Sequence, residues 1–157
     1  MFTGIIQAVG KISRIEPLQQ GVRLAERHQH RMLGPLLSNL SDLICLEGLS
    51  AEGLKTGERA LAENLKTYGE GHWRVAQARV LCAYCQSQLG ETTATPAALT
   101  AELHVMELRW GTNTLYVQRA RMQLRRVFAQ QSPRGEGSGK ALDTVPAMAG
   151  FERDISP

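Results

Sequence analysis

Apolar residues recur every three or four positions through most of the chain after residue 30, the spacing that places them on one face of an α-helix. The first such run starts beside Pro35 and ends at Gly48. Proline suits the first turn of a helix, because its missing N–H would have no partner there, and glycine suits the position just past the end. The run therefore predicts a helix whose apolar stripe is made of Leu36, Leu37, Leu40, Leu43, Ile44 and Leu46.

Four more runs with the same period predict four more helices, each bounded by residues that favour helix ends. Ser50 and Thr95 are expected caps, since a hydroxyl oxygen accepts a hydrogen bond from a free backbone N–H. Gly69 and Gly111 are expected stops. Gly57, inside the first of these helices, is expected to weaken it by about 1 kcal/mol relative to alanine. The expected ranges are 50–68, 72–89, 96–110 and 114–131.

Both ends of the chain differ in composition from the middle. The first 24 residues are rich in β-branched side chains and include Phe2, and such residues favour strands. Residues 1–24 are therefore predicted to be extended, as one strand or as a hairpin with its turn near Pro17. Residues 131–157 hold Gly, Ser and Pro with few large apolar residues, and a flexible tail is predicted there. The β-forming residues near the start are Phe2, Thr3, Ile5, Ile6, Val9, Ile12, Ile15 and Val22.

Two parts of the chain resemble each other at an offset of 42 residues. The glycines that end successive helices recur at this offset, Gly48 with Gly90 and Gly69 with Gly111. A period of this size is typical of stacked repeats, whose units bury their apolar faces against one another. Such proteins usually bind other proteins, so catalysis is not expected. Further matched pairs are Leu61 and Leu103, Val75 and Val117, Ala78 and Ala120, and Arg79 and Arg121.

Charge changes this picture only locally. The chain has 157 residues, enough for one domain with a core, and a net charge of +3 that requires no polyanionic partner. From Arg109 to Arg134, however, arginines occur without a single acidic residue. A solvated basic helix explains this run, and binding of nucleic acid or an anionic surface is the alternative.

The three cysteines, Cys45, Cys82 and Cys85, are odd in number and follow no secreted framework, so a reducing, cytoplasmic location is predicted. Cys82 and Cys85 lie within one expected helix, where both sulfurs would pack in the core. A redox site would need a strand before the pair, and a zinc site would need two more ligands at matching spacing. No metal or cofactor is expected. No apolar run reaches the roughly 20 residues of a membrane-spanning helix, and the first residues do not resemble a signal peptide.

The helical part, residues 30–130, resembles tetratricopeptide repeats of the longer, roughly 42-residue type, which in bacteria often follow a Ser/Thr kinase domain. The resemblance is carried by residues 69–76, where a glycine, an acid and a histidine precede the next helix, as in the turn between two repeats of that family. The pattern departs at Gly53, at Gly57 and over residues 91–95. The second helix of the second repeat is therefore expected to be shorter or shifted.

This resemblance implies an all-α fold in which antiparallel helical hairpins stack as a short solenoid, with a groove lined by the first helix of each pair. In peptide-binding members, an asparagine at the position of Asn39 bonds to the ligand backbone, and basic residues bind carboxylates. Carried over residue by residue, the groove positions are Asn39, Asp42, Gln77, Val80, Tyr84, Arg119, Met122 and Arg126. Trp73 and Trp110 are expected to pack between repeats.

Residues 1–24 resemble a different family. The sequence from Met1 through Ile12 is very close to the amino terminus of riboflavin synthase, an enzyme made of two β-barrels. In that family the residue matching Phe2 lies at the active site. The resemblance stops near Leu24, and one strand cannot close a barrel, so this activity is not expected here.

Together these patterns predict an all-α protein in three parts: an extended segment over residues 1–24, a repeat domain over 25–130 and a flexible tail over 131–157. The predicted function is binding of a protein or peptide without catalysis. Fewer than three full repeats rarely stand alone, so self-association through exposed end helices is also expected. One alternative is an inactive riboflavin synthase fragment. The other is binding of nucleic acid or an anionic surface by the arginine-rich last helix, although nucleic acid is not the expected partner.

Overall fold

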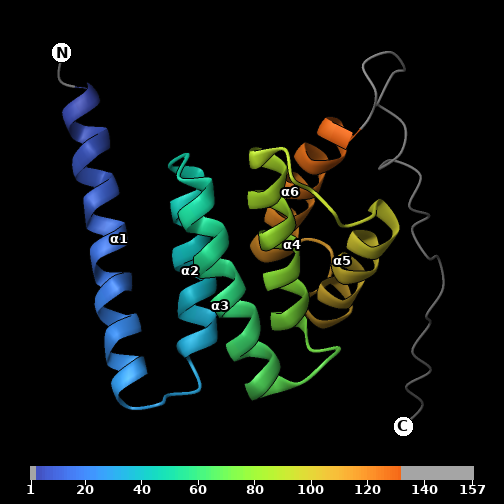
Figure 1. The fold of residues 1–157 in the computed structure, drawn as a ribbon, viewed down its shortest axis with the longest axis horizontal. Coiled ribbons are helices and arrows are strands. Elements are labelled where there is room, and N and C mark those ends of the chain that lie inside the picture. Colours follow the sequence, from blue (N-terminus) through green and yellow to red (C-terminus); the bar gives the residue numbers. More distant parts are fainter. Residues whose placement is uncertain (1–2, 132–157) are drawn as a thin grey trace, which may run out of the picture.

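The described residues fold into six α-helices and contain no β-strand (Figure 1). A computed structural model describes the backbone of residues 3–131 and the side chains of residues 15–131. The prediction of an all-α fold is confirmed, while the predicted tail over 131–157 lies almost entirely outside the described residues. The helices are α1 (Thr3–Arg27), α2 (Leu33–Leu46), α3 (Ser50–Tyr68), α4 (Trp73–Leu89), α5 (Pro96–Trp110) and α6 (Leu115–Gln131).

The five helices after residue 30 lie where the apolar period predicts them, and local hydrogen bonds define two of their starts. His72 Nδ1 accepts a hydrogen bond from the Arg74 N–H at 3.2 Å before α4. Thr95 Oγ1 accepts one from the Ala98 N–H at 3.2 Å before α5. The cap predicted at Ser50 is wrong, because Ser50 is the first residue of α3 and donates its hydroxyl to a glutamine of α4. As expected, α5 is shorter than α3, with 15 residues against 19.

The N-terminal segment is a helix, so the prediction of an extended segment over residues 1–24 is wrong. Ile15, Leu18 and Val22 lie three and four positions apart, and they pack together against α2. β-propensity describes how well a side chain fits a pleated, half-buried surface, and tertiary packing overrides it. Here the apolar stripe finds its partner on another helix, and α1 runs unbroken through the boundary predicted between residues 24 and 25.

The central helix of the fold is α4. It contacts α2, α3, α5 and α6, whereas α1 packs mainly against α2 and lies at the outer edge (Figure 1). Helix α2 pairs with α3, and α4 pairs with α5, while α4 also touches both α2 and α6. The last residues of α2, α4 and α6 are 46, 89 and 131, and those of α3 and α5 are 68 and 110. The sequence offset of 42 residues is therefore kept, within one residue, in the spacing of the helix ends.

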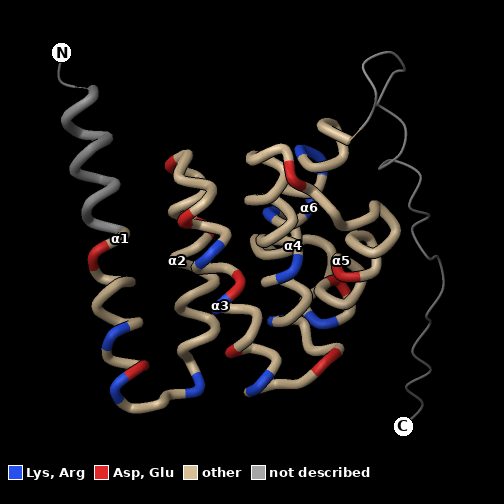
Figure 2. Tube along the Cα trace, viewed as in Figure 1, with Lys and Arg blue, Asp and Glu red and all other residues tan. Residues whose placement is uncertain are grey.

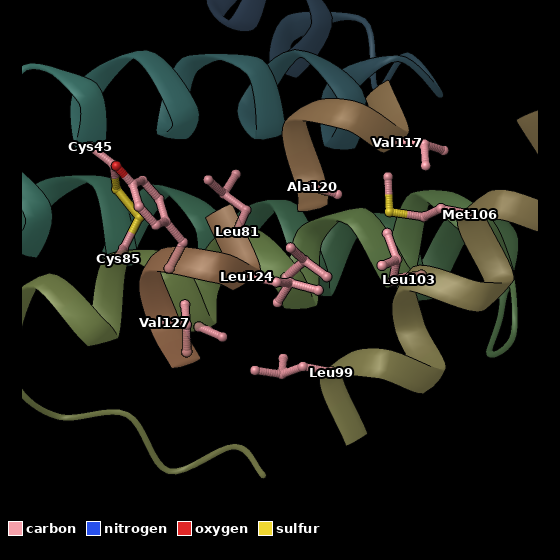
Figure 3. Packing of buried hydrophobic residues seen from close by; sticks show 14 residues of the cluster. Cys45, Leu81, Cys85, Leu99, Leu103, Met106, Val117, Ala120, Leu124 and Val127 are labelled. Carbon is pink, nitrogen blue, oxygen red and sulfur yellow. A yellow bond between two sulfur atoms is a disulfide. The ribbon is translucent and has the colours of Figure 1, made fainter. Parts of the chain in front are cut away.

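Two clusters of buried apolar side chains hold the helices together. The larger lies among α4, α5 and α6, and α2 contributes Cys45 to it (Figure 3). Met106, Val117 and Leu124 are fully buried there. Burying one side chain of this size stabilises the fold by about 1.5–3 kcal/mol, so this cluster is what fixes α6 on the second helix pair. The smaller cluster joins α1, α2 and α3 and is made of Val22, Leu37, Leu40, Ile44 and Ala60.

Small residues allow α2 and α3 to approach closely. Ser41 Oγ of α2 donates a hydrogen bond to the Gly53 carbonyl at 2.6 Å. A Cβ atom at Gly53 would lie 3.1 Å from the Cys45 nitrogen, and one at Gly57 would lie 2.9 Å from Ser41 Oγ and 3.2 Å from Cys82 Sγ. The glycines that depart from the repeat pattern are therefore the residues that this helix contact requires.

A disulfide joins Cys45 of α2 to Cys85 of α4, with the two Cα atoms 5.9 Å apart (Figure 3). Cys82 is buried and carries a free thiol. Both cysteines of the pair Cys82 and Cys85 are buried, as predicted, but the bond to Cys45 leaves only Cys82 as a thiol. Because disulfides persist mainly in oxidising compartments, the bond also weakens the reasoning that led from the cysteine count to a reducing location.

Candidate peptide-binding face

The predicted groove residues lie on α2, α4 and α6, the first helices of the expected repeats. We call their shared surface the first-helix face and define it by Asn39, Asp42, Gln77, Tyr84, Arg119 and Arg126. The structure brings Asp42, Gln77 and Arg119 together around one small hollow, whose free volume of about 20 Å³ holds one or two water molecules rather than a ligand. The other residues that line it are Ser38, Leu81, Met106, Tyr116, Ala120 and Gln123.

A polar network between α2 and α6 forms one wall of the hollow. Arg119 Nε lies 2.7 Å from Asp42 Oδ2, and Gln123 Nε2 donates a hydrogen bond to Asp42 Oδ1 at 2.9 Å. Burial raises the pKa of Asp42 above its ordinary value of 3.8, and the charge and hydrogen bonds of Arg119 and Gln123 offset part of that rise. Asp42 and Arg119 are thus partnered inside the protein, and their first role is to join the two helices.

Tyr84 and Arg126, which are 42 residues apart, contact each other across the α4–α6 interface. Arg126 Nη1 donates a hydrogen bond to Tyr84 Oη at 2.9 Å, and its guanidinium carbon lies 6.0 Å from the centre of the ring. The Tyr84 side chain is only 1% exposed, so its ring belongs to the core. Residues separated by one repeat offset therefore meet on neighbouring first helices.

The remaining predicted residues are not brought into the hollow. Asn39 is exposed, and Met122 is 51% exposed, whereas Val80 is buried in the core. Sequence reasoning missed Gln123, although it lies four positions after Arg119 and so on the same side of α6. That helical spacing was the available signal.

The two tryptophans pack together, but within the α4–α5 pair and not between repeats as predicted. The Trp73 and Trp110 rings meet edge to face, with their centroids 5.0 Å apart. This contact joins the start of α4 to the end of α5, and a tilted contact of each ring with Tyr116 extends it to α6.

The arginine-rich helix uses much of its charge inside the protein. Arg119 pairs with Asp42, Arg121 Nη2 lies 2.6 Å from Glu107 Oε1, and Arg126 bonds to the Tyr84 hydroxyl. Arg134, at the end of the run, lies outside the described residues. The contacts of α6 therefore favour its interpretation as a structural helix over a phosphate-binding one.

The chemistry available in the described part of the chain is limited. Its His, Cys, Asp and Glu side chains form no group of three or more that could hold a metal ion. Burial raises the pKa of Cys82 to about 12, and the charge of Glu58 adds to the rise, so the thiol stays protonated and is a poor nucleophile. None of the helices in residues 3–131 has the length and hydropathy needed to cross a membrane.

Comparisons with models of protein families, with curated proteins and with solved structures found no match. The structural class of the chain therefore follows from its own helices and their contacts. It is an all-α protein made of consecutive helix pairs, in which the central first helix contacts both other first helices.

Proposed function

We propose that this chain is a short tetratricopeptide-like module that binds an extended peptide or protein segment across the first-helix face. The observation that supports the proposal is the contact between Tyr84 and Arg126, which hold the same position in consecutive units and bond to each other. Such a contact is expected when two repeats stack in register. The pair of Asp42 with Arg119 extends the same surface to α2.

The exposed residues of this face are the ones that would contact the ligand. The Asn39 amide can donate to and accept from a peptide backbone. The Arg126 guanidinium has five N–H donors and uses one on Tyr84, so others are available for a carboxylate. Met122 offers an adaptable apolar contact beside them on α6.

A peptide library displayed on phage, with selected peptides then measured by isothermal titration calorimetry, tests the proposal. Loss of a hydrogen bond to a charged group costs about 1.5–3 kcal/mol, so Arg126→Ala should weaken binding at least tenfold, and Asn39→Ala should weaken it severalfold. Lys55→Ala, an exposed change on α3, is the matched control and should leave the affinity unchanged. Peptides whose affinity ignores both Asn39 and Arg126, or the absence of any selected peptide, would reject the proposal.

The other expectations have no observation that favours them over this function. The riboflavin synthase alternative relies on Phe2, which lies outside the described residues. A cytoplasmic location and self-association stay predictions. The state of the Cys45–Cys85 bond in the native protein bears directly on the compartment, because a reducing compartment would open it.

A further inference from the structure

Aromatic and arginine side chains gather at one end of the fold, where α3 leads into α4 and α5 leads into α6. We call this group the turn-end cluster. Figure 1 shows the end of α3, the turn into α4 and the start of α2 at the same lower end of the molecule. The cluster is made of Tyr68, His72, Trp73, Arg74, Arg109, Trp110 and Tyr116.

The rings of the cluster form a continuous layer with an exposed edge. The Trp110 centroid lies 5.0 Å from that of Trp73 and 5.8 Å from that of Tyr116, and Trp73 and Tyr116 are 6.4 Å apart. Packing between helices accounts for these contacts. It does not account for the exposure of the outer two rings, since Trp110 is 36% exposed and Tyr116 is 46% exposed. Part of each of these two side chains is therefore open to solvent.

Two guanidinium groups flank these rings, and neither pairs with a carboxylate of the described residues. The guanidinium carbon of Arg74 lies 4.5 Å from the Trp73 ring centre, and that of Arg109 lies 5.3 Å from the Trp110 ring centre. The neighbouring acids are already occupied. Glu70 pairs with an arginine of α4 at 2.7 Å, and Glu107 pairs with an arginine of α6 at 2.6 Å.

The surrounding surface is also basic. Figure 2 shows Lys or Arg positions at the lower ends of α1 and α3. Arg27, Arg31 and Lys66 are exposed, and none forms an ion pair with a described residue. The Tyr68 hydroxyl donates a hydrogen bond to the Arg31 carbonyl at 3.0 Å, which connects this basic margin to the rings. Burial lowers the pKa of His72 below its ordinary value of 6.5, and the charges of the two cluster arginines lower it further. The cluster therefore carries positive charge that nothing in the described chain neutralises.

We propose that the turn-end cluster binds single-stranded nucleic acid, with bases stacked on Trp110 and Tyr116 and phosphates bound by Arg74 and Arg109. Exposed aromatic rings beside arginines are the elements from which such sites are built, because every base has a face that can stack. An acidic peptide would satisfy the arginines and leave the rings unused. A duplex hides the faces of its bases. The site adjoins the proposed peptide-binding face, because Tyr116 also lines the hollow there. It uses Arg74 and Arg109 to bind phosphates, not the arginines of α6 that the sequence suggested.

The two tryptophans of the chain both lie in this cluster, so intrinsic tryptophan fluorescence reports on the cluster alone. The full chain would be titrated with an oligothymidylate of about twelve nucleotides, within the usual site size of such proteins. We expect saturable quenching at low salt. Tyr116→Leu keeps an apolar side chain but removes the ring, and should weaken binding at least fivefold.

The double variant Arg74→Gln/Arg109→Gln tests the phosphate contacts. Losing two contacts to a single strand should lower the slope of log affinity against log salt by about 1.4. The control variant Lys55→Gln/Arg125→Gln removes the same amount of charge from exposed positions outside the cluster. Its slope should stay within about 0.3 of the parent slope, a much smaller change than the loss of two phosphate contacts would cause. Circular dichroism spectra would show that each variant keeps its helices.

Three results would overturn the inference. The first is the absence of quenching at an oligonucleotide concentration of about 100 μM, which is the weak end of non-specific binding. The second is an affinity that responds equally to the cluster variant and to its control. The third is equal binding of a polyglutamate peptide of the same length or of duplex DNA, which would show that charge alone is recognised.

Discussion

Replacing Gly53 with alanine sets helix propensity against helix packing, and the structure decides which of them wins. Alanine is about 1 kcal/mol more favourable than glycine inside a helix. At Gly53, however, a new Cβ would clash with Cys45 Sγ and would lie 3.1 Å from the Cys45 nitrogen and 3.3 Å from the Ser41 carbonyl oxygen. The sulfur cannot rotate away, because the disulfide to Cys85 holds it. The backbones of α2 and α3 must therefore move apart.

Overpacking of this kind costs about 1–3 kcal/mol, and a clash against backbone and a fixed sulfur belongs at the upper end of that range. After subtracting the propensity gain, Gly53→Ala should lower the free energy of unfolding by about 1–2 kcal/mol. Gly21→Ala is the matched control, because its Cβ would meet only Leu36 methyl groups at 3.7 Å. That change should raise stability by about 0.5–1 kcal/mol.

Urea unfolding followed by circular dichroism at 222 nm measures both changes, provided that the slope with urea is the same in each variant. Counting free thiols in the denatured variant should give one, as in the parent chain, which shows that the disulfide still forms. The reasoning fails if Gly53→Ala is as stable as the parent while Gly21→Ala shows the expected gain, since the close contact of α2 with α3 would then be absent.

Three further outcomes follow from the cysteines and from the polar network. Reduction of the Cys45–Cys85 bond, which spans 40 residues, should lower the free energy of unfolding by about 4 kcal/mol; equal urea midpoints with and without dithiothreitol would contradict this. Cys82 should resist iodoacetamide at pH 8 in the folded protein and react in urea, as mass spectrometry would show, because burial raises its pKa to about 12. Carboxyl NMR should place the pKa of Asp42 above 3.8, and Arg119→Met should raise it further, since Arg119 favours the charged form. An unchanged or lower pKa of Asp42 in Arg119→Met would refute this role of Arg119. Because the folded pKa of Asp42 lies above its ordinary value, the contribution of Asp42 to stability is greatest below pH 3.8 and falls as the pH rises through the folded pKa.

The local pattern of the sequence was sufficient to predict the helices after residue 30. Their apolar period, the cap at Thr95 and the stops at Gly69 and Gly111 act within a few residues of the chain, so they can be recognised without knowing the fold. The resemblance to tetratricopeptide repeats, and not helical spacing alone, placed Asp42, Gln77 and Arg119 on the first helices, and the structure brings the three together.

Long-range contacts decided what the local pattern could not. Residues near Ile15 are β-formers by propensity, yet they form a helix because α2 offers an apolar surface to pack against. Gly57 lowers the stability of its own helix, as the sequence indicates. The packing of α3 against α2 nevertheless requires a glycine there, because a Cβ atom would lie 2.9 Å from Ser41 Oγ. The choice of Cys45 over Cys82 as the partner of Cys85 depends on which side of α4 meets α2.

The sequence by itself therefore determined where the helices lie and which residues share a side of each. Only the tertiary structure decided that Asp42 and Arg119 neutralise each other, that Tyr84 is a core residue, and that Arg74 and Arg109 have no acidic partner in the described chain. The physical reason is that propensity and periodicity are properties of a few consecutive residues. Burial and charge pairing depend on what another helix, often dozens of residues away, places opposite.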